Sequence, residues 1–261
     1  MGRDTIANSV VDINDGAYLL KLNSGCTKEL TVRGNTNLLI TECESDSTLN
    51  IKVEKDANIV LSVLSNDTVN NLKITANIEE NGSIDAYFAD FSKGKGKATI
   101  TINLNKERAQ ANWHLASLAG DKDNKEFDVS IIHNVANTFG QSDNYGVCKD
   151  DARLVFSGVS SIIKHAVKSK THQNAKIMVF DEKSIGVAKP ILKIDENDIE
   201  ASHAAVVGKI NDDHLFYLTS RGLTDEQAKQ LITYGYLKPI LNGFDDEEIK
   251  NEINSLIEGR M

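Results

Sequence analysis

Short segments rich in Val, Ile, Leu and Thr follow one another about every ten residues between positions 28 and 132, separated by Asn, Asp, Gly and Ser. In residues 48–53 and 98–103, apolar side chains alternate with polar ones, as expected of strands with one buried face. No helical segment interrupts the series. The sequence therefore predicts a mainly β fold: a sandwich, a barrel or a coiled β-solenoid.

The connections between these segments favour the solenoid. The chain has two prolines, Pro190 and Pro239, while Asn, Asp and Gly recur between strands. Asn and Gly tolerate the left-handed backbone conformation that the corners of stacked coils use. We therefore predict a parallel β-helix in which each coil stacks on the one before it.

The last part of the chain has a helical pattern. Thr224 and Gln227 form a capping-box sequence, which predicts a helix from there to about Tyr234, where Gly235 should end it. A second helix is predicted from Asp245 to Gly259, with Ile249, Ile253, Leu256 and Ile257 as one apolar stripe. Two such helices need a surface to pack on, so residues 223–261 are predicted to be a small helical domain appended to a β core of residues 1–222.

Composition and charge exclude several classes of function. The net charge is −9 and the basic residues are scattered, which argues against nucleic-acid binding. No run of 18 apolar residues and no signal-peptide core occur, so we expect a cytoplasmic protein without membrane contact. The three cysteines, Cys26, Cys43 and Cys148, are too widely spaced for a cysteine metal site or a disulfide framework.

Several motifs in the second half resemble the SufB/SufD family of iron–sulfur cluster assembly scaffolds. They occur in the family's order: His133 to Thr138, Lys149 to Gly158, Thr171 to Gln173, and Pro190 to Gly222 with its Ser202-His203 pair. Four motifs in order over about 90 residues are far more specific than any one of them. The chain looks like a compact SufD-like member without the long N-terminal helical region of many SufD proteins.

The resemblance implies a β-helix core and a C-terminal helical domain. It further implies a scaffold rather than an enzyme, on which an iron–sulfur cluster or iron is bound transiently, with no permanent cofactor. The expected partners are a SufC-like ABC ATPase, docked through residues 223–261, and a second β-helix, either a SufB-like subunit or another copy of this chain.

His203 is the residue that the resemblance singles out as an iron or cluster ligand. On a strand it shares one face with Ala201 and Ala205, while Glu200 lies on the other face and is a weaker candidate. A lone strand histidine is otherwise more often a structural residue with a satisfied ring nitrogen. The positions where relatives carry thiols read Ala201 and, in the neighbouring strand, Asn174, so this chain lacks the family's cysteines there.

The remaining histidines and carboxylates have simpler interpretations. His165 and His172 are predicted to be surface or loop residues, and His114, His133 and His214 structural ones. Asp212 and Asp213 are predicted to form a polar hairpin turn before a strand at residues 215–218. Two alternatives stay open: a pectin-lyase-like enzyme, which would need paired carboxylates beside a sugar groove, and a purely structural solenoid.

Overall fold

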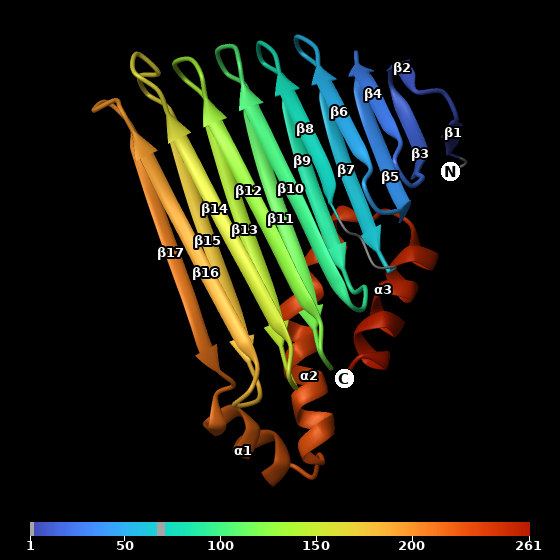
Figure 1. Ribbon diagram of the computed structural model, residues 1–261. Coiled ribbons are helices and arrows are strands. Elements are labelled where there is room, and N and C mark those ends of the chain that lie inside the picture. Colours follow the sequence, from blue (N-terminus) through green and yellow to red (C-terminus); the bar gives the residue numbers. More distant parts are fainter. Residues whose placement is uncertain (1–2, 67–70) are drawn as a thin grey trace.

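Two parallel β-sheets face each other in the computed structural model, which describes residues 3–66 and 71–261 (Figure 1). The chain alternates between the sheets, so that each coil contributes one strand to each. The nine-stranded sheet contains β1 (Asp4–Ile6), β3 (Gly16–Leu22), β5 (Asn35–Cys43), β7 (Asn58–Ser65), β9 (Ser83–Asp90), β11 (Gln110–Ala119), β13 (Phe139–Cys148), β15 (Lys170–Val179) and β17 (Glu200–Lys209). The eight-stranded sheet contains β2 (Val10–Ile13), β4 (Thr27–Val32), β6 (Thr48–Val53), β8 (Leu72–Ile78), β10 (Lys95–Leu104), β12 (Asn124–His133), β14 (Arg153–Ile162) and β16 (Ile185–Ile194). The predicted parallel β-helix is confirmed.

The main core lies between the two sheets. The predicted alternation holds: Leu49, Ile51 and Val53 are buried there, and Ile100 and Ile102 repeat the pattern four strands later. Edge-on contacts between aromatic rings cross from sheet to sheet and then along the second sheet, from Phe88 to Phe127 and on to Phe156, each with 5.9 Å between ring centroids. Each coil thus buries its apolar row against the opposite strand and against its neighbours.

Left-handed residues turn the chain at the corners, as the sequence predicts. Most are Asn or Asp, with φ between 54° and 60°: Asp46, Asp56, Asn71, Asn81, Asp121, Asn137 and Asp150. The short polar side chain makes this conformation less costly for Asn and Asp than for bulkier residues. Side-chain hydrogen bonds join successive corners; Asn81 Nδ2, for example, donates to Asp56 Oδ1 at 2.6 Å.

Helices cover part of the outer face of the nine-stranded sheet, toward the C-terminal ends of its strands (Figure 1). The helical region contains α1 (Asp212–Ser220), α2 (Asp225–Leu237), the 3-10 helix η1 (Lys238–Gly243) and α3 (Glu247–Gly259). Its apolar residues Leu237, Ile240, Phe244, Ile253 and Ile257 pack on Leu39, Leu64, Phe91, Ala116, Leu118 and Val147 of the sheet. The helices therefore bury their apolar face in a second core that is separate from the one between the sheets.

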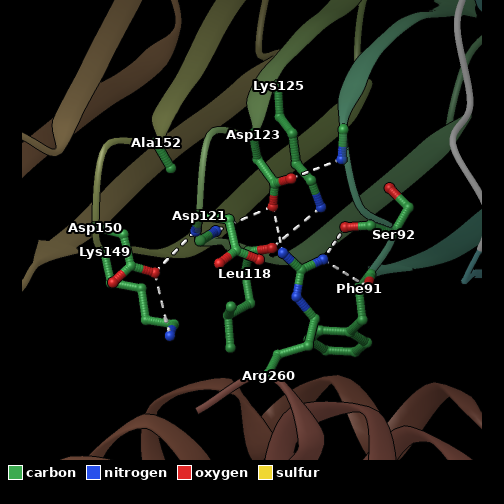
Figure 2. A network of polar contacts seen from close by, with 12 residues as sticks. Phe91, Ser92, Leu118, Asp121, Asp123, Lys125, Lys149, Asp150, Ala152 and Arg260 are labelled. Atoms are coloured by element: carbon green, nitrogen blue, oxygen red, sulfur yellow. Dashed lines mark hydrogen bonds and ion pairs between the residues drawn. The ribbon is translucent and has the colours of Figure 1, made fainter.

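Ion pairs fasten both ends of α3 to the solenoid. At its N-terminal end, Arg3 Nη1 donates to Asp246 Oδ2 at 2.9 Å. At its C-terminal end, the guanidinium of Arg260 donates to the backbone oxygens of Phe91 and Ser92 and to the carboxylate of Asp123, and both side chains are buried (Figure 2).

A second buried ion pair lies beside the Arg260 contact. Lys125 Nζ donates to Asp90 Oδ2 at 2.5 Å and to the backbone oxygen of Leu118 at 3.0 Å. Burial lowers the pKa of Lys125, and the adjacent Asp90 carboxylate opposes this shift. Two cations, Lys125 and Arg260, and the anion Asp123 (Figure 2) are therefore enclosed together with the carboxylate of Asp90 where the helical region meets the coils.

Four details of the predicted helical region are wrong. Residues 215–218 belong to helix α1 rather than to a strand, because Asn211 Oδ1 caps the backbone N–H groups of Asp213 and His214 at 2.8 and 3.1 Å. Asp212 and Asp213 form the first turn of that helix and no hairpin. The helical part thus begins at Asp212, whereas the domain boundary at residue 222 stays a prediction.

Gly235 does not end α2, which runs on to the buried Leu237. Packing of Leu237 against the sheet favours the extra turn, and Gly235 does not adopt the positive φ of a helix-ending glycine. α3 begins at Glu247 with Asp246 as its N-cap, two residues later than predicted. The capping box of Thr224 and Gln227 is confirmed, with N···O distances of 3.2 and 2.9 Å.

Candidate functional site

His203 lies on β17, the last strand of its sheet. Its side chain projects from the face of the strand that points toward the inside of the solenoid. Its partner in register is Gln173 on β15, and the flanking pairs are Ala201 with Thr171 and Ala205 with Ala175. Gln173, Thr171 and Ala175 are all buried between the sheets. His203 is nevertheless exposed, because β17 has a strand neighbour on one side only and the coil that it closes is the last one.

Glu200 does not join His203 within one chain. The two residues leave opposite faces of β17, as the alternation predicts. Glu200 Oε1 instead pairs with Lys170 Nζ at 2.8 Å on the outer face. Ser202 is also on the outer face, where its hydroxyl lies 2.8 Å from Nδ1 of His172.

The remaining histidines lie elsewhere. His114 is stacked on Tyr87 with 4.7 Å between ring centroids, and burial lowers its pKa although Asp143 opposes the shift. His165 is a corner residue with a φ of 73°, and His214 lies in α1. Within residues 3–66 and 71–261, no three side chains among His, Cys, Asp and Glu are grouped so that they could hold a metal ion.

His133, which the sequence predicts to be structural, lies in the interior of the solenoid. It is buried at the end of β12, and its Nδ1 is 2.7 Å from the hydroxyl oxygen of Thr138. Burial lowers its pKa to about 4, so the imidazole is neutral at physiological pH. Its Nε2 has no hydrogen-bond partner in the part of the chain that the structure describes.

The thiols are distant from His203 or deeply buried. Cys148 is in register with Val179 and, through it, with Lys209, six residues along β17 from His203. That separation is about 20 Å at the rise of a β-strand. Burial raises the pKa of Cys148 to about 11 and that of Cys43 to about 12, so neither thiol is a ready thiolate. Asn174, one of the two positions where the resemblance implies a thiol, donates from Nδ2 to the Tyr145 hydroxyl at 3.2 Å.

The interior of the last coils contains buried polar side chains among the apolar ones, which the sequence reasoning missed. Trp113 Nε1 donates to Asn144 Oδ1 at 3.1 Å, and Asn144 Nδ2 donates to Ser142 Oγ at 3.0 Å. One coil further on, Gln173 Nε2 donates to Ser160 Oγ at 2.6 Å. A signal was present in the sequence: Thr171 and Gln173 occupy the same alternating positions as Ala175 and Ile177, so polar residues stand in a row that should be apolar.

The end of the solenoid that carries His203 exposes apolar side chains and two strand edges. Val206 and Val207 on β17 are 54% and 45% exposed, and Ile185 and Ile191 on β16 are 52% and 45% exposed. β16 and β17 are each the last strand of their sheets. An uncovered edge of this kind is a template for pairing with another chain.

A second exposed apolar surface lies on the helices. Phe216 and Tyr217 of α1 and Leu231 of α2 are at least half exposed. A cleft of about 560 Å³ adjoins Leu231 and is lined further by Leu223, Gln227, Gln230, Tyr234 and Glu258. Among the described helices, none has both the length and the apolar character needed to cross a membrane.

A protein-family model and several known proteins match this chain. Residues 20–236 match the family model described as SUF system FeS cluster assembly, SufBD core domain. The chain is 38% identical over 137 residues to the iron–sulfur cluster assembly protein SufD of Bacillus subtilis, which covers 52% of this chain and 31% of that protein. It is 30% identical over 115 residues to SufD of Escherichia coli, covering 44% and 27% of the two chains.

A SufB protein is similar as well. SufB of Bacillus subtilis is 26% identical over 145 residues, which is 56% of this chain and 31% of SufB. The matched segments thus span less than a third of the length of these three relatives.

Proposed function

This chain belongs to the SufBD family of the SUF system, and we propose that it is a scaffold subunit for iron–sulfur cluster assembly rather than an enzyme. The observation that carries the proposal is the placement of His203: an imidazole on the inner face of the terminal coil, exposed at an unpaired sheet edge. A neutral imidazole is a good ligand for iron. In this scheme iron and sulfide are the cargo, held in transit.

One chain supplies only part of the site. His203 has no thiolate near it, and Glu200 leaves the opposite face of β17. We propose that a second β-helix completes the ligand set by pairing at the β16 and β17 edges, where Val206, Val207 and Ile191 would be buried. The partner is either a SufB-like subunit that brings a thiolate or a second copy of this chain, related by a two-fold axis.

The helical region is the proposed docking site for a SufC-like ABC ATPase. The exposed aromatic and aliphatic side chains of Phe216, Tyr217 and Leu231 are unusual for a free surface and typical of the centre of a protein interface. The cleft beside Leu231 adds a hollow to this exposed apolar surface of the helical region. We place the assembled complex in the cytoplasm, where its three free thiols would stay reduced.

Substitution of His203 tests the proposal. We expect His203→Ala to abolish the absorbance that develops when the complex is incubated anaerobically with iron and sulfide, while the ATPase still co-purifies. His172→Ala is the matched control, because it removes an imidazole from the outer face of the adjacent strand. Undiminished cluster formation in the His203 variant would reject the site.

A second experiment addresses the partner. Replacing Phe216 and Leu231 with Ser should release the ATPase without changing the solenoid, because neither side chain is part of the second core. Retention of the ATPase by this variant would place its docking site elsewhere.

A further inference from the structure

We infer that Gln173 is a positioning residue for His203: its side-chain oxygen accepts the N–H of the imidazole and leaves the other ring nitrogen free to bind iron. This inference rests on the proposed function, because it assigns a partner to the proposed ligand. It begins from the register of β15 and β17, in which Gln173 and His203 are direct partners on the same inner face. Neighbouring strands are about 4.8 Å apart, so the two side chains start side by side.

The orientation of the Gln173 amide is determined by its contacts. Nε2 donates to Ser160 Oγ on β14 at 2.6 Å and to the backbone oxygen of Ile191 on β16 at 3.2 Å. A backbone carbonyl oxygen only accepts hydrogen bonds, so the nitrogen and not the oxygen must face Ile191. The side chain therefore links three strands around the last coil and presents its oxygen to the interior.

That oxygen has unused hydrogen-bonding capacity. Gln173 is 6% exposed, and its Oε1 is buried without a hydrogen-bond partner in the described part of the chain. Gly158 leaves room for it, since a Cβ at that position would lie 3.0 Å from Oε1. A buried carbonyl oxygen without a partner is costly, which favours a donor that reaches it in the functional state.

His203 supplies the donor that this site needs. A histidine that binds a metal through one ring nitrogen nearly always donates the N–H of the other to an acceptor, which selects the tautomer and the ring orientation. Within the described part of the chain, the exposed imidazole of His203 offers an N–H donor, and the buried amide of Gln173, its partner in register, has an oxygen that lacks a donor. A hydrogen bond between them satisfies both and directs the free ring nitrogen toward the open end.

The tautomer of His203, measured by long-range ¹H–¹⁵N correlation on the full-length chain, tests this assignment. We expect one dominant tautomer in the wild-type protein and a mixture in Gln173→Met, which keeps the side-chain length and removes the amide. Thr171→Val is the matched control: it removes an unpartnered buried hydroxyl from the same face of β15, but its partner in register is Ala201. The control should retain the wild-type tautomer.

Titration with Co²⁺ gives a second readout on the same variants within the assembled complex. Loss of such a partner typically weakens metal binding ~10- to 100-fold, and we expect a weakening in this range for Gln173→Met only. A mixture of His203 tautomers in the wild-type chain would by itself overturn the inference. Equal effects of Gln173→Met and Thr171→Val would also overturn it. If His203→Ala supports normal cluster formation, the proposed function fails; if His203 is required but its tautomer is indifferent to Gln173, only this inference fails.

Discussion

The ion pair between Arg260 and Asp123 gives the sharpest prediction about stability, because it joins the end of α3 to a corner of the solenoid (Figure 2). Arg260→Met removes the charge and retains an unbranched side chain of similar length. The substitution leaves the backbone oxygens of Phe91 and Ser92 without this donor. It also leaves a buried carboxylate without its cation.

The expected loss of stability depends on the hydrogen bonds that Asp123 retains in the variant. Removing one partner of a buried ion pair typically costs about 3–5 kcal/mol. Asp123 still accepts from the backbone N–H groups of Gly94 and Gly120, at 2.6 and 3.0 Å, so its charge stays partly compensated. We therefore expect the lower end, about 3 kcal/mol. With a urea dependence of about 3 kcal/mol per molar, the midpoint should fall by about 1 M.

The assay is urea unfolding followed by two probes. Far-ultraviolet circular dichroism at the helix minimum reports the helical region, and the fluorescence of Trp113, the single tryptophan, reports the solenoid core. We expect both signals of Arg260→Met to report the same midpoint, lowered by about 1 M relative to wild type. Lys250→Met is the control, since it breaks an exposed pair with Glu247 on the same helix and should cost about 1 kcal/mol or less.

A double-mutant cycle with Asp123→Asn completes the test. If the two side chains interact as described, the double variant should be clearly less destabilised than the sum of the single variants. An Arg260→Met protein within about 0.5 kcal/mol of wild type, or strict additivity in the cycle, would refute the reasoning.

Two further predictions concern buried groups with shifted pKa values. The pKa of His133 is about 4 in the folded protein and about 6.5 in the unfolded chain. As the pH falls, the unfolded chain therefore binds this proton first, and the free energy of unfolding should fall by about 3 kcal/mol between pH 6.5 and 4. His133→Gln should flatten this part of a pH-dependent unfolding series; an unchanged slope would count against a buried neutral imidazole. The Cys148 thiol, with its pKa raised to about 11, should react with a disulfide reagent at pH 8 roughly 100-fold or more slowly than the partly exposed Cys26. Mass spectrometry of partly labelled protein would measure this, and equal rates would contradict the burial of Cys148.

Much of the fold was predictable because its signals are local. Alternation in residues 48–53 depends on neighbours two positions apart, and the box at Thr224 depends on Gln227 three positions on. The strand at residues 215–218 was predicted wrongly because its residues suit either state locally. The cap from Asn211, together with the end of strand pairing after Lys209, decides for the helix. The prediction that Gly235 ends α2 is wrong for a related reason. The packing of Leu237 on a sheet that is distant in sequence extends α2 past Gly235.

The candidate site also combines features that the local sequence predicts with features that depend on the tertiary structure. The sequence placed His203 and Glu200 on opposite faces of a strand, and the family motifs singled out His203. Its pairing with Gln173 was not foreseeable, because the register of two strands 30 residues apart depends on how each coil closes. The exposure of His203 follows from its position on the last strand of the sheet, which is a property of the whole stack.

By itself, the sequence determined the elements that depend on near neighbours: the alternating strands, the Asn and Asp corners, the capped helix and the motifs that identify the family. Only the tertiary structure decided which inner positions meet across coils, where the helices pack, and that Arg260 reaches Asp123 from 137 residues away. The physical reason is the separation along the chain of the residues that make each contact. A hydrogen bond three residues along is encoded in the chain at that point, whereas a contact between coils exists only after every intervening coil has taken its length and register.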